Sequence, residues 1–392
     1  MRDVMSRRVA GFGTTVFVEI NELADRYHAV NLGQGAPDFD APPEVREAAV
    51  EAVRSGLNQY APSTGLRIAR EAIAGHAERF YGQKVDPDTE VLVTAGATEA
   101  VFATILGVTD PGDEVIVFQP VYDTYVPNMV MAGVTARYVT LRGDDWMFDA
   151  GELAQAFTPR ARAIIINTPN NPTGKVFSLE ELQIVAELCI KHDVIAITDE
   201  VYEHILYDDA VHTRLATLPG MADRTVTISS LGKTFSVTGW KIGWAIAARS
   251  LIESVNRAHQ FITFCVASPL QAAAATALTL SPGYFKSLQK TFQGKRDRMS
   301  AALEKIGLRV LKAQGGYFVM ADWRGVAPAQ VKDDMQFARW LTAEVGVACI
   351  PPGVFYQDSD RHLGKFLARF AICKKDETLD AAAQRLAKLG KW

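Results

Sequence analysis

Cysteine is scarce in this chain: only Cys189, Cys265, Cys349 and Cys373 occur among 392 residues. They lie far apart and none belongs to a C-x-x-C pair, so the sequence indicates neither a disulfide framework nor a zinc site. We interpret them as buried free thiols. We therefore expect no metal ion in this protein.

Long apolar runs and an excess of basic charge are missing as well. No stretch approaches the roughly 18 apolar residues that suggest a membrane span, and the start MRDVMSRRVAGFG lacks the apolar core of a secretory signal. The formal net charge is −4, without a basic run or a basic stripe of aromatic residues, which argues against a nucleic-acid partner. These absences predict a cytoplasmic protein that binds neither membranes nor nucleic acid.

The chain does have a hydrophobic share of 48%, enough for a large core, and its length exceeds that of one typical domain. Seven strand-like runs alternate with helix-like stretches. Several runs are almost continuously apolar, as in parallel strands buried on both faces. This alternation predicts an α/β fold with a doubly wound sheet, whose ligands bind at the carboxyl ends of the strands. The runs are EVLVTAG (90–96), DEVIVFQP (113–120), ARYVTL (136–141), ARAIIINTP (161–169), DVIAITDE (193–200), TVTISS (225–230) and KIGWAIA (241–247).

Two helices are expected in this region, over 98–109 and 178–192, and the second begins with a capping box of Ser178 and Glu181. The ends of the chain look different. The first 45 residues are predicted to be mostly irregular, and toward the C-terminus helical segments (287–307) mix with short strands (315–321). We predict a large domain over 46–282. Residues 1–45 would form an N-terminal arm and part of a smaller α+β domain, completed by 283–392.

Polar side chains follow several of the predicted strands. In TAGATEA (94–100), Gly96 permits a tight turn, the first helical amides are unpaired donors and Thr98 offers a hydroxyl, which together suit an anion such as phosphate. Any strand–helix turn shares this pattern. In NTPNNPTG (167–174), Asn171 either offers an amide to a ligand oxygen or belongs to a plain proline turn.

A carboxylate and an amine follow two further strands. Asp199 in TDEVY (198–202) ends a buried run, where its charge needs a partner such as a protonated ring nitrogen. Tyr202 would reach the same ligand, and the alternative is an aspartate that caps the next helix. Lys233 lies among hydroxyl groups in SSLGKTFSVTGWKIGW (229–244). Burial and nearby cations lower a lysine pKa and make the amine a nucleophile, whereas the alternative is an exposed loop lysine.

These four features fit one ligand if they meet at the edge of one sheet. That ligand carries a phosphate, a phenolic oxygen, a basic ring nitrogen and an aldehyde, which together describe pyridoxal 5'-phosphate. The lysine would form a Schiff base with the aldehyde. The aspartate would hold the proton of the ring nitrogen, which makes the ring an electron sink.

The chain resembles the class I/II (fold type I) pyridoxal-phosphate aminotransferases, and among them the subgroup of kynurenine, glutamine–phenylpyruvate and methionine aminotransferases. The resemblance spans roughly residues 25 to 375, and its motifs occur in the family's order. They are NLGQGAPDFD, NQYAPSTGLRIAREAIA, NTPNNPTG, TDEVY, SLGKTFSVTGWKIGW and LARFAIC. It implies a homodimeric enzyme of amino-acid metabolism that moves an amino group between an L-amino acid and a 2-oxo acid by a ping-pong mechanism.

The resemblance also implies roles for individual residues. Lys233 would be the Schiff-base lysine and the proton shuttle, Asp199 would pair with the ring nitrogen, and Tyr202 and Asn171 would hold the phenolic oxygen. Arg369 would clamp the substrate carboxylate in a bidentate pair. The remaining roles are phosphate binding by Ala97, Thr98, Ser230 and Lys241, stacking on the ring by Tyr122, a phosphate contact by Tyr60 across the dimer interface, and substrate contacts by Gly35, Asn171 and Phe17.

Three positions depart from the family's pattern. Lys241 stands where many relatives have arginine, so it offers phosphate a point charge without the guanidinium fork. Tyr122 replaces the tryptophan or phenylalanine of some relatives. Ala36 in GAPDF takes the place of a phenylalanine common in the subgroup, which leaves more room at the substrate entrance.

The substrate is the least defined part of this interpretation. No arginine is clearly placed for a second carboxylate, and Phe17, Tyr60 and Tyr122 suggest an apolar pocket. We therefore predict a neutral, sulfur-containing or aromatic amino acid, with an aspartate-type enzyme as the alternative. A carbon–sulfur β-lyase on the same fold is a second hypothesis, because the same lysine and aspartate would serve it. The third is a non-catalytic ligand sensor, which would need an added DNA-binding domain that we do not expect here.

Overall fold

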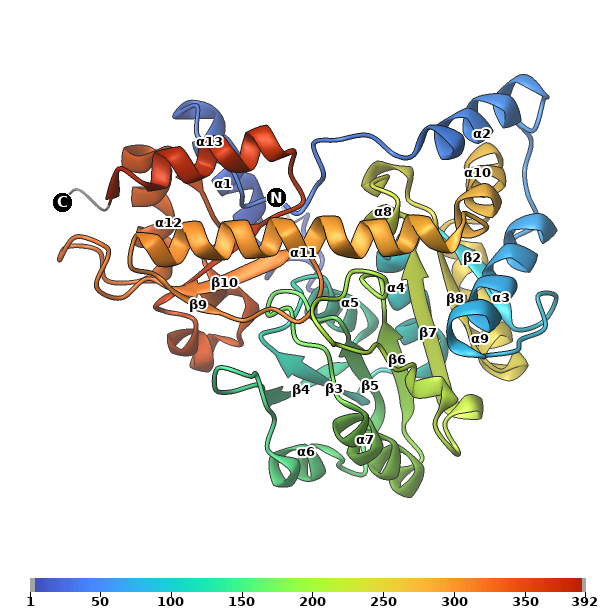
Figure 1. The fold of residues 1–392 in the computed structure, drawn as a ribbon. Helices are drawn as coiled ribbons and strands as arrows, with labels where there is room; N and C mark the ends of the chain where they lie inside the picture. The colour runs from blue at the N-terminus through green and yellow to red at the C-terminus, as the bar shows by residue number, and fades with distance from the viewer. Residues whose placement is uncertain (1–3, 390–392) are drawn as a thin grey trace.

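The computed structural model describes residues 4–389. Its centre is a seven-stranded sheet of order β2-β8-β7-β6-β5-β3-β4 (Figure 1). Strands β7, β6, β5, β3 and β4 are parallel, whereas β8 is antiparallel to both of its neighbours, so the predicted mostly parallel α/β sheet is confirmed. The strands are β2 (Val91–Thr94), β3 (Glu114–Gln119), β4 (Thr135–Thr140), β5 (Ala161–Asn167), β6 (Ile195–Asp199), β7 (Thr225–Ser230) and β8 (Gly243–Ile246).

Helices cover both faces of this sheet, and α11 crosses the molecule in front of it (Figure 1). The helices are α1 (Val16–Arg26), α2 (Pro43–Arg54), α3 (Arg67–Tyr81), α4 (Gly96–Val108), α5 (Tyr125–Ala132), α6 (Ala150–Ala156), α7 (Leu179–His192), α8 (Leu231–Thr234), α9 (Arg249–Ile262), α10 (Ser268–Leu278), α11 (Pro282–Lys305), α12 (Asp334–Trp340) and α13 (Asp376–Leu386).

Alternate side chains of the central strands pack into different cores. In β3, Ile116 and Phe118 pack with apolar side chains of α7, whereas Val115 and Val117 pack with those of α4 and α9. Because successive side chains of a strand point to opposite faces, a sheet covered on both sides needs apolar residues at nearly every position. This is why the strand-like runs are continuously apolar.

The helices predicted over 98–109, 178–192 and 287–307 are present as α4, α7 and the larger part of α11. Helix α7 has the predicted capping box: Ser178 Oγ accepts from the Glu181 N–H at 3.2 Å, and Glu181 Oε2 accepts from the Ser178 N–H at 2.9 Å. Helix α1 lies within the segment expected to be mostly irregular. Its apolar positions Ile20 and Ala24 are four residues apart and buried, so their helical spacing was the signal for this helix.

The two ends of the chain come together beside the large sheet. Strand β1 (Val30–Asn31) pairs with β11 (Val347–Ala348) in parallel. A three-stranded antiparallel sheet of order β12-β10-β9 lies on the same side, formed by β9 (Arg309–Leu311), β10 (Phe318–Asp322) and β12 (Leu367–Ala371). The domain boundaries at 45 and 282 stay predictions.

Two absences expected from composition can be compared with the structure. Over residues 4–389, no helix combines the length and the apolar character needed to cross a bilayer. All four cysteines are unpaired; Cys189, Cys349 and Cys373 are buried and Cys265 is half-buried.

Candidate active site

One cavity of about 350 Å³ gathers almost all the side chains singled out in the sequence. It lies at the carboxyl edge of the sheet, where Asn167 ends β5, Asp199 ends β6 and Ser230 ends β7. The predicted site residues that line it are Phe17, Gly35, Ala97, Thr98, Tyr122, Asn171, Asp199, Tyr202, Ser230, Lys233, Lys241 and Arg369. Tyr60 is the predicted residue that does not.

The amino terminus of α4 forms one wall of the cavity. No side chain caps this helix, so its first N–H groups remain available to an anion. A Cβ on Gly96 would lie 3.0 Å from the Lys241 Nζ, which shows how near this amine is to the helix terminus. A Cβ on Gly243 would come within 2.6 Å of the Gly96 carbonyl carbon, so β8 can approach α4 this closely only with glycine there. Backbone amides, an ammonium group and the nearby Ser230 together suit a phosphate.

Asp199 is buried at the end of β6. The Tyr125 hydroxyl donates to its Oδ2 at 2.5 Å and the Val201 N–H donates to its Oδ1 at 3.3 Å. Burial raises the pKa of Asp199, and these hydrogen bonds and Lys233 oppose that rise. No helix begins directly after Asp199, because the next helical turn starts at Leu215, so the helix-cap alternative does not apply. Its carboxylate is held in place by these hydrogen bonds and is suited to a protonated nitrogen of a ligand.

Lys233 lies in the short helix α8 and faces the cavity. Burial lowers its pKa to about 8. The charges of Lys241 and Arg369 also lower this pKa, whereas the charge of Asp199 raises it. Its Nζ is 5.7 Å from the centre of the Tyr202 ring and 5.3 Å from that of Tyr317. The alternative of an exposed loop lysine therefore does not apply, and a substantial share of the amine is neutral and nucleophilic near pH 8.

Arg369 enters the cavity from β12. Its Nη1 donates to the Asn171 Oδ1 at 2.8 Å and its Nη2 donates to the Gly33 carbonyl at 3.0 Å. The guanidinium lies 4.0 Å from the centre of the Phe318 ring, and its Nε is buried without a partner. Within residues 4–389 it forms no ion pair, although burial lowers its pKa only to about 10. A buried guanidinium without a direct ion pair is suited to a ligand carboxylate.

Several cavity residues carried no signal in the sequence. Tyr125 donates to Asp199, Phe318 packs against Arg369, and Gln34 and Asp123 also line the wall. The signal for Tyr125 was its position in VYDTY (121–125), shortly after β3 and three residues after Tyr122. Gln34 and Asp123 adjoin the predicted residues Gly35 and Tyr122 in the chain, whereas Phe318 becomes a neighbour of the site only through tertiary contacts.

Tyr60 lies apart from these residues. Its side chain is 82% exposed and packs edge-on against Phe264, with the ring centres 5.3 Å apart. Phe261, in the same region, is 87% exposed. Within this chain, Tyr60 does not line the cavity.

The family of the chain follows from comparison with known proteins. The family "Aminotransferase class I and II" matches residues 27–386. "Probable N-succinyldiaminopimelate aminotransferase" of Mycobacterium tuberculosis is 44% identical over 97% of this chain and 98% of that protein. "Methionine aminotransferase" of Escherichia coli is 39% identical over 96% of each. "Kynurenine–oxoglutarate transaminase" of Dictyostelium discoideum is 39% identical over 98% of this chain and 96% of that protein.

Comparison with solved structures supports the same family. The N-succinyldiaminopimelate aminotransferase of M. tuberculosis superposes with a TM-score of 0.95 at 44% identity, over 98% of this chain and 100% of that one. The chain belongs to the class I and II aminotransferases. It is a pyridoxal-phosphate-dependent enzyme that acts on amino acids and oxo acids.

The residues present fit this cofactor. The uncapped amino terminus of α4 and the ammonium group of Lys241 suit its phosphate. The buried carboxylate of Asp199 suits its protonated ring nitrogen, and the amine of Lys233 suits its aldehyde.

Proposed function

We propose that the enzyme transfers the amino group of a neutral L-amino acid, sulfur-containing or aromatic, to a 2-oxo acid acceptor. Both half-reactions would use the same cavity in turn, which is a ping-pong cycle. The names of the relatives include a succinylated diamino acid, kynurenine and methionine, and therefore leave the side chain open.

The proposed roles follow from the chemistry of each side chain. Bound pyridoxal phosphate supplies an electron-poor ring that accepts the charge left when the substrate loses its α-proton. Lys233 would bind the cofactor and then, as a free amine, move that proton. Asp199 would hold the proton on the ring nitrogen, supported by the hydroxyl of Tyr125. Tyr202 and the amide nitrogen of Asn171 would donate to the ring's phenolic oxygen.

The remaining lining residues would bind and orient. Arg369 would pair with the substrate α-carboxylate, with Gly35 and Phe17 beside the substrate. Tyr122 would stack on the ring. The phosphate would be bound by Ala97, Thr98, Ser230 and Lys241.

The substrate proposal rests on the cations that line the cavity, because a side-chain carboxylate would need one of them as a partner. They are Lys233, Lys241 and Arg369, and the proposed roles use each of them. A side-chain carboxylate would then meet no positive partner within this protomer, whereas Asp123 adds a negative group to the wall. Desolvating an unpaired carboxylate is costly, so a neutral side chain is favoured.

A half-reaction panel tests this proposal. Each amino acid is mixed alone with the holoenzyme, and the absorbance of the bound cofactor is followed. Methionine, glutamine, phenylalanine and kynurenine are expected to convert it faster than aspartate or N-succinyl-diaminopimelate. Faster conversion by either dicarboxylic substrate would contradict the neutral-substrate proposal. Pyruvate and ammonia released from a cysteine conjugate, with no conversion of the cofactor, would indicate a β-lyase instead.

We also propose that the enzyme is a homodimer in which Tyr60 reaches the phosphate in the partner's cavity. The exposed Tyr60, Phe261 and Phe264 support this, because large apolar side chains gathered on a surface mark interaction sites. Light scattering is expected to give about twice the chain mass of 42.8 kDa, and Tyr60→Phe is expected to weaken cofactor binding. A monomer with full cofactor affinity would contradict the proposal. The cytoplasmic location stays a prediction.

A further inference from the structure

The turn that follows β6 has two faces with different surroundings. Asp199, Val201 and Tyr202 line the cavity. Glu200 and Glu203, from the same turn, do not; both are almost fully buried on its other side. The turn therefore places residues of the active site on one face and two buried carboxylates on the other.

The buried carboxylates are held by side chains from separate parts of the chain. Glu203 accepts from the Ser229 hydroxyl and from the Arg214 Nη2, both at 2.8 Å. Glu200 accepts from the Thr198 hydroxyl at 2.8 Å and contacts the His212 Nε2 at 2.9 Å. Burial alone would raise the pKa of Glu203, but the charge of Arg214 holds it well below its usual range.

Arg214 links the two carboxylates. Its Nε lies 3.1 Å from the Glu200 Oε2 while its Nη2 binds Glu203. Its Nη1 donates to Gln83 Oε1 at 3.0 Å, and its guanidinium stacks 3.9 Å from the centre of the Tyr81 ring. The position for a cation between Glu200 and Glu203 is therefore already filled by the protein.

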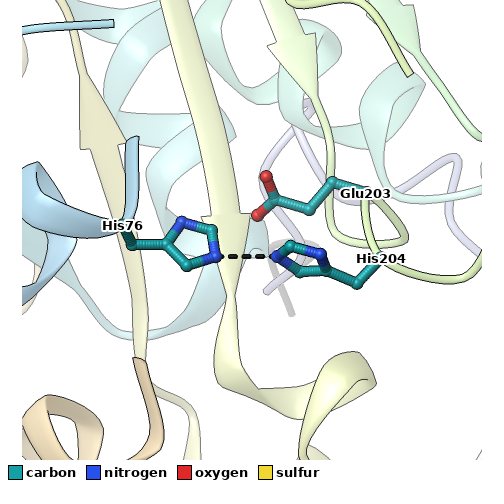
Figure 2. Close-up of side chains that lie close together, drawn as sticks. All are labelled: His76, Glu203 and His204. Carbon is teal, nitrogen blue, oxygen red and sulfur yellow. Dashed lines mark hydrogen bonds between the residues drawn. The ribbon is translucent and has the colours of Figure 1, made fainter. Parts of the chain in front are cut away.

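Two histidines extend this cluster, with a donor set that resembles a metal site. The ligand atoms of His76, Glu203 and His204 lie within 4.8 Å of one another. Figure 2 shows the two rings pointing at each other, with their Nε2 atoms 2.7 Å apart. A metal would need both nitrogen lone pairs directed at one third point, at about 2.0–2.1 Å from each. Here one ring donates an N–H to the other. Burial lowers the pKa of His76 to about 4 and that of His204 to about 3, so both imidazoles are neutral near pH 7.

We propose that Glu203 is a positioning residue of the active site. Through Ser229 on β7 and through Arg214, it fixes the turn that carries Asp199 and Tyr202 relative to the strand that leads to Lys233. A loose turn would let the carboxylate and the phenol move away from the cofactor ring. The proposal rests on the roles proposed above for Asp199 and Tyr202.

The test is Glu203→Gln, which keeps the volume and removes the charge. The dissociation constant of pyridoxal phosphate is expected to rise about tenfold. The midpoint of the pH titration of the bound cofactor's absorbance is expected to move by at least about 0.5 unit. Ser229→Ala removes only the hydroxyl group and its hydrogen bond to Glu203. It is expected to shift the dissociation constant and the titration midpoint in the same direction as Glu203→Gln, but by less. It replaces Glu203→Gln if that variant does not fold.

Glu114→Gln is the matched control. Glu114 is also a buried carboxylate that accepts from a hydroxyl and a guanidinium, those of Thr158 at 2.6 Å and Arg160 at 2.5 Å, but it lies at the opposite end of the sheet. It is expected to lose stability without changing cofactor affinity or the titration. If Glu203→Gln and Ser229→Ala behave like this control, Glu203 has only a structural role and the proposal is wrong.

Two further measurements separate the possible failures. Asp199→Asn is titrated in parallel: an unchanged midpoint there would overturn the proposed role of Asp199 and this proposal with it. An effect of Asp199→Asn without one of Glu203→Gln would overturn this proposal alone. A stoichiometric metal in the wild-type protein that is lost in His76→Gln would show a ligand set instead of an imidazole hydrogen bond, and would also overturn it.

Discussion

Replacing Lys233 with alanine is expected to lower kcat by about 10⁴-fold or more, since the variant loses both the nucleophilic amine and the group that moves the α-proton. Steady-state kinetics measure the loss. Borohydride reduction followed by peptide mass spectrometry should find the cofactor's added mass on the Lys233 peptide of the wild type. A small primary amine such as ethylamine is expected to restore part of the activity of Lys233→Ala.

Lys295→Ala is the control for this loss. Lys295 is another buried lysine, bound to the Lys374 carbonyl and paired with Asp376 at 3.0 Å, and it does not line the cavity. Its removal is expected to reduce stability but not kcat. Equal losses of kcat in both variants would mean that Lys233 acts only through folding.

The pKa of Lys233 also predicts how the rate of cofactor loading depends on pH. Only the neutral amine attacks the aldehyde, and burial lowers the pKa of Lys233 to about 8. The rate at which the apoenzyme combines with pyridoxal phosphate is therefore expected to rise with pH and to level off above about 8. A rate still rising toward pH 10 would indicate an ordinary exposed lysine.

Arg369→Met is expected to lower kcat/KM for every amino acid by about 10³-fold, because a buried charge-assisted pair with the substrate carboxylate is lost. The free energy of unfolding is expected to stay within about 1 kcal/mol of the wild type, because removing a buried cation that has no direct ion pair offsets the two lost hydrogen bonds. Kinetics and urea unfolding measure the two effects separately.

Arg296→Met provides the contrast. Arg296 is buried and stacks on Tyr207, but it pairs with Asp208 at 3.0 Å and does not line the cavity. Its loss is expected to lower the free energy of unfolding by about 1–3 kcal/mol, discounted for the partial exposure of Asp208, and to leave kcat/KM unchanged. If Arg369→Met lost stability and kept its activity, its proposed role would be wrong.

Local patterns in the sequence were sufficient for much of this description. The strand-like runs alternate with helices, so the mostly parallel sheet could be predicted from periodicity and connection lengths. The start of α7 could be predicted from four consecutive residues, because Ser178 and Glu181 form its capping box. The motifs around Asn171, Asp199 and Lys233 follow strands, and parallel strands bring their carboxyl ends to one edge. This is why residues far apart in the sequence could be expected in one cavity.

Tertiary structure alone decided what surrounds those residues. Tyr125 reaches Asp199 because α5, the helix after β3, begins beside the carboxyl end of β6, and Phe318 meets Arg369 because β10 pairs with β12. The cluster behind the turn joins Glu203 to His76, more than a hundred residues away. Sequence spacing describes neighbours along one helix or strand, whereas the pKa of Lys233 and the unpaired charge of Arg369 depend on burial. Burial is a property of the packed chain, so the chemistry of the candidate site was predictable by residue type and its tuning was not.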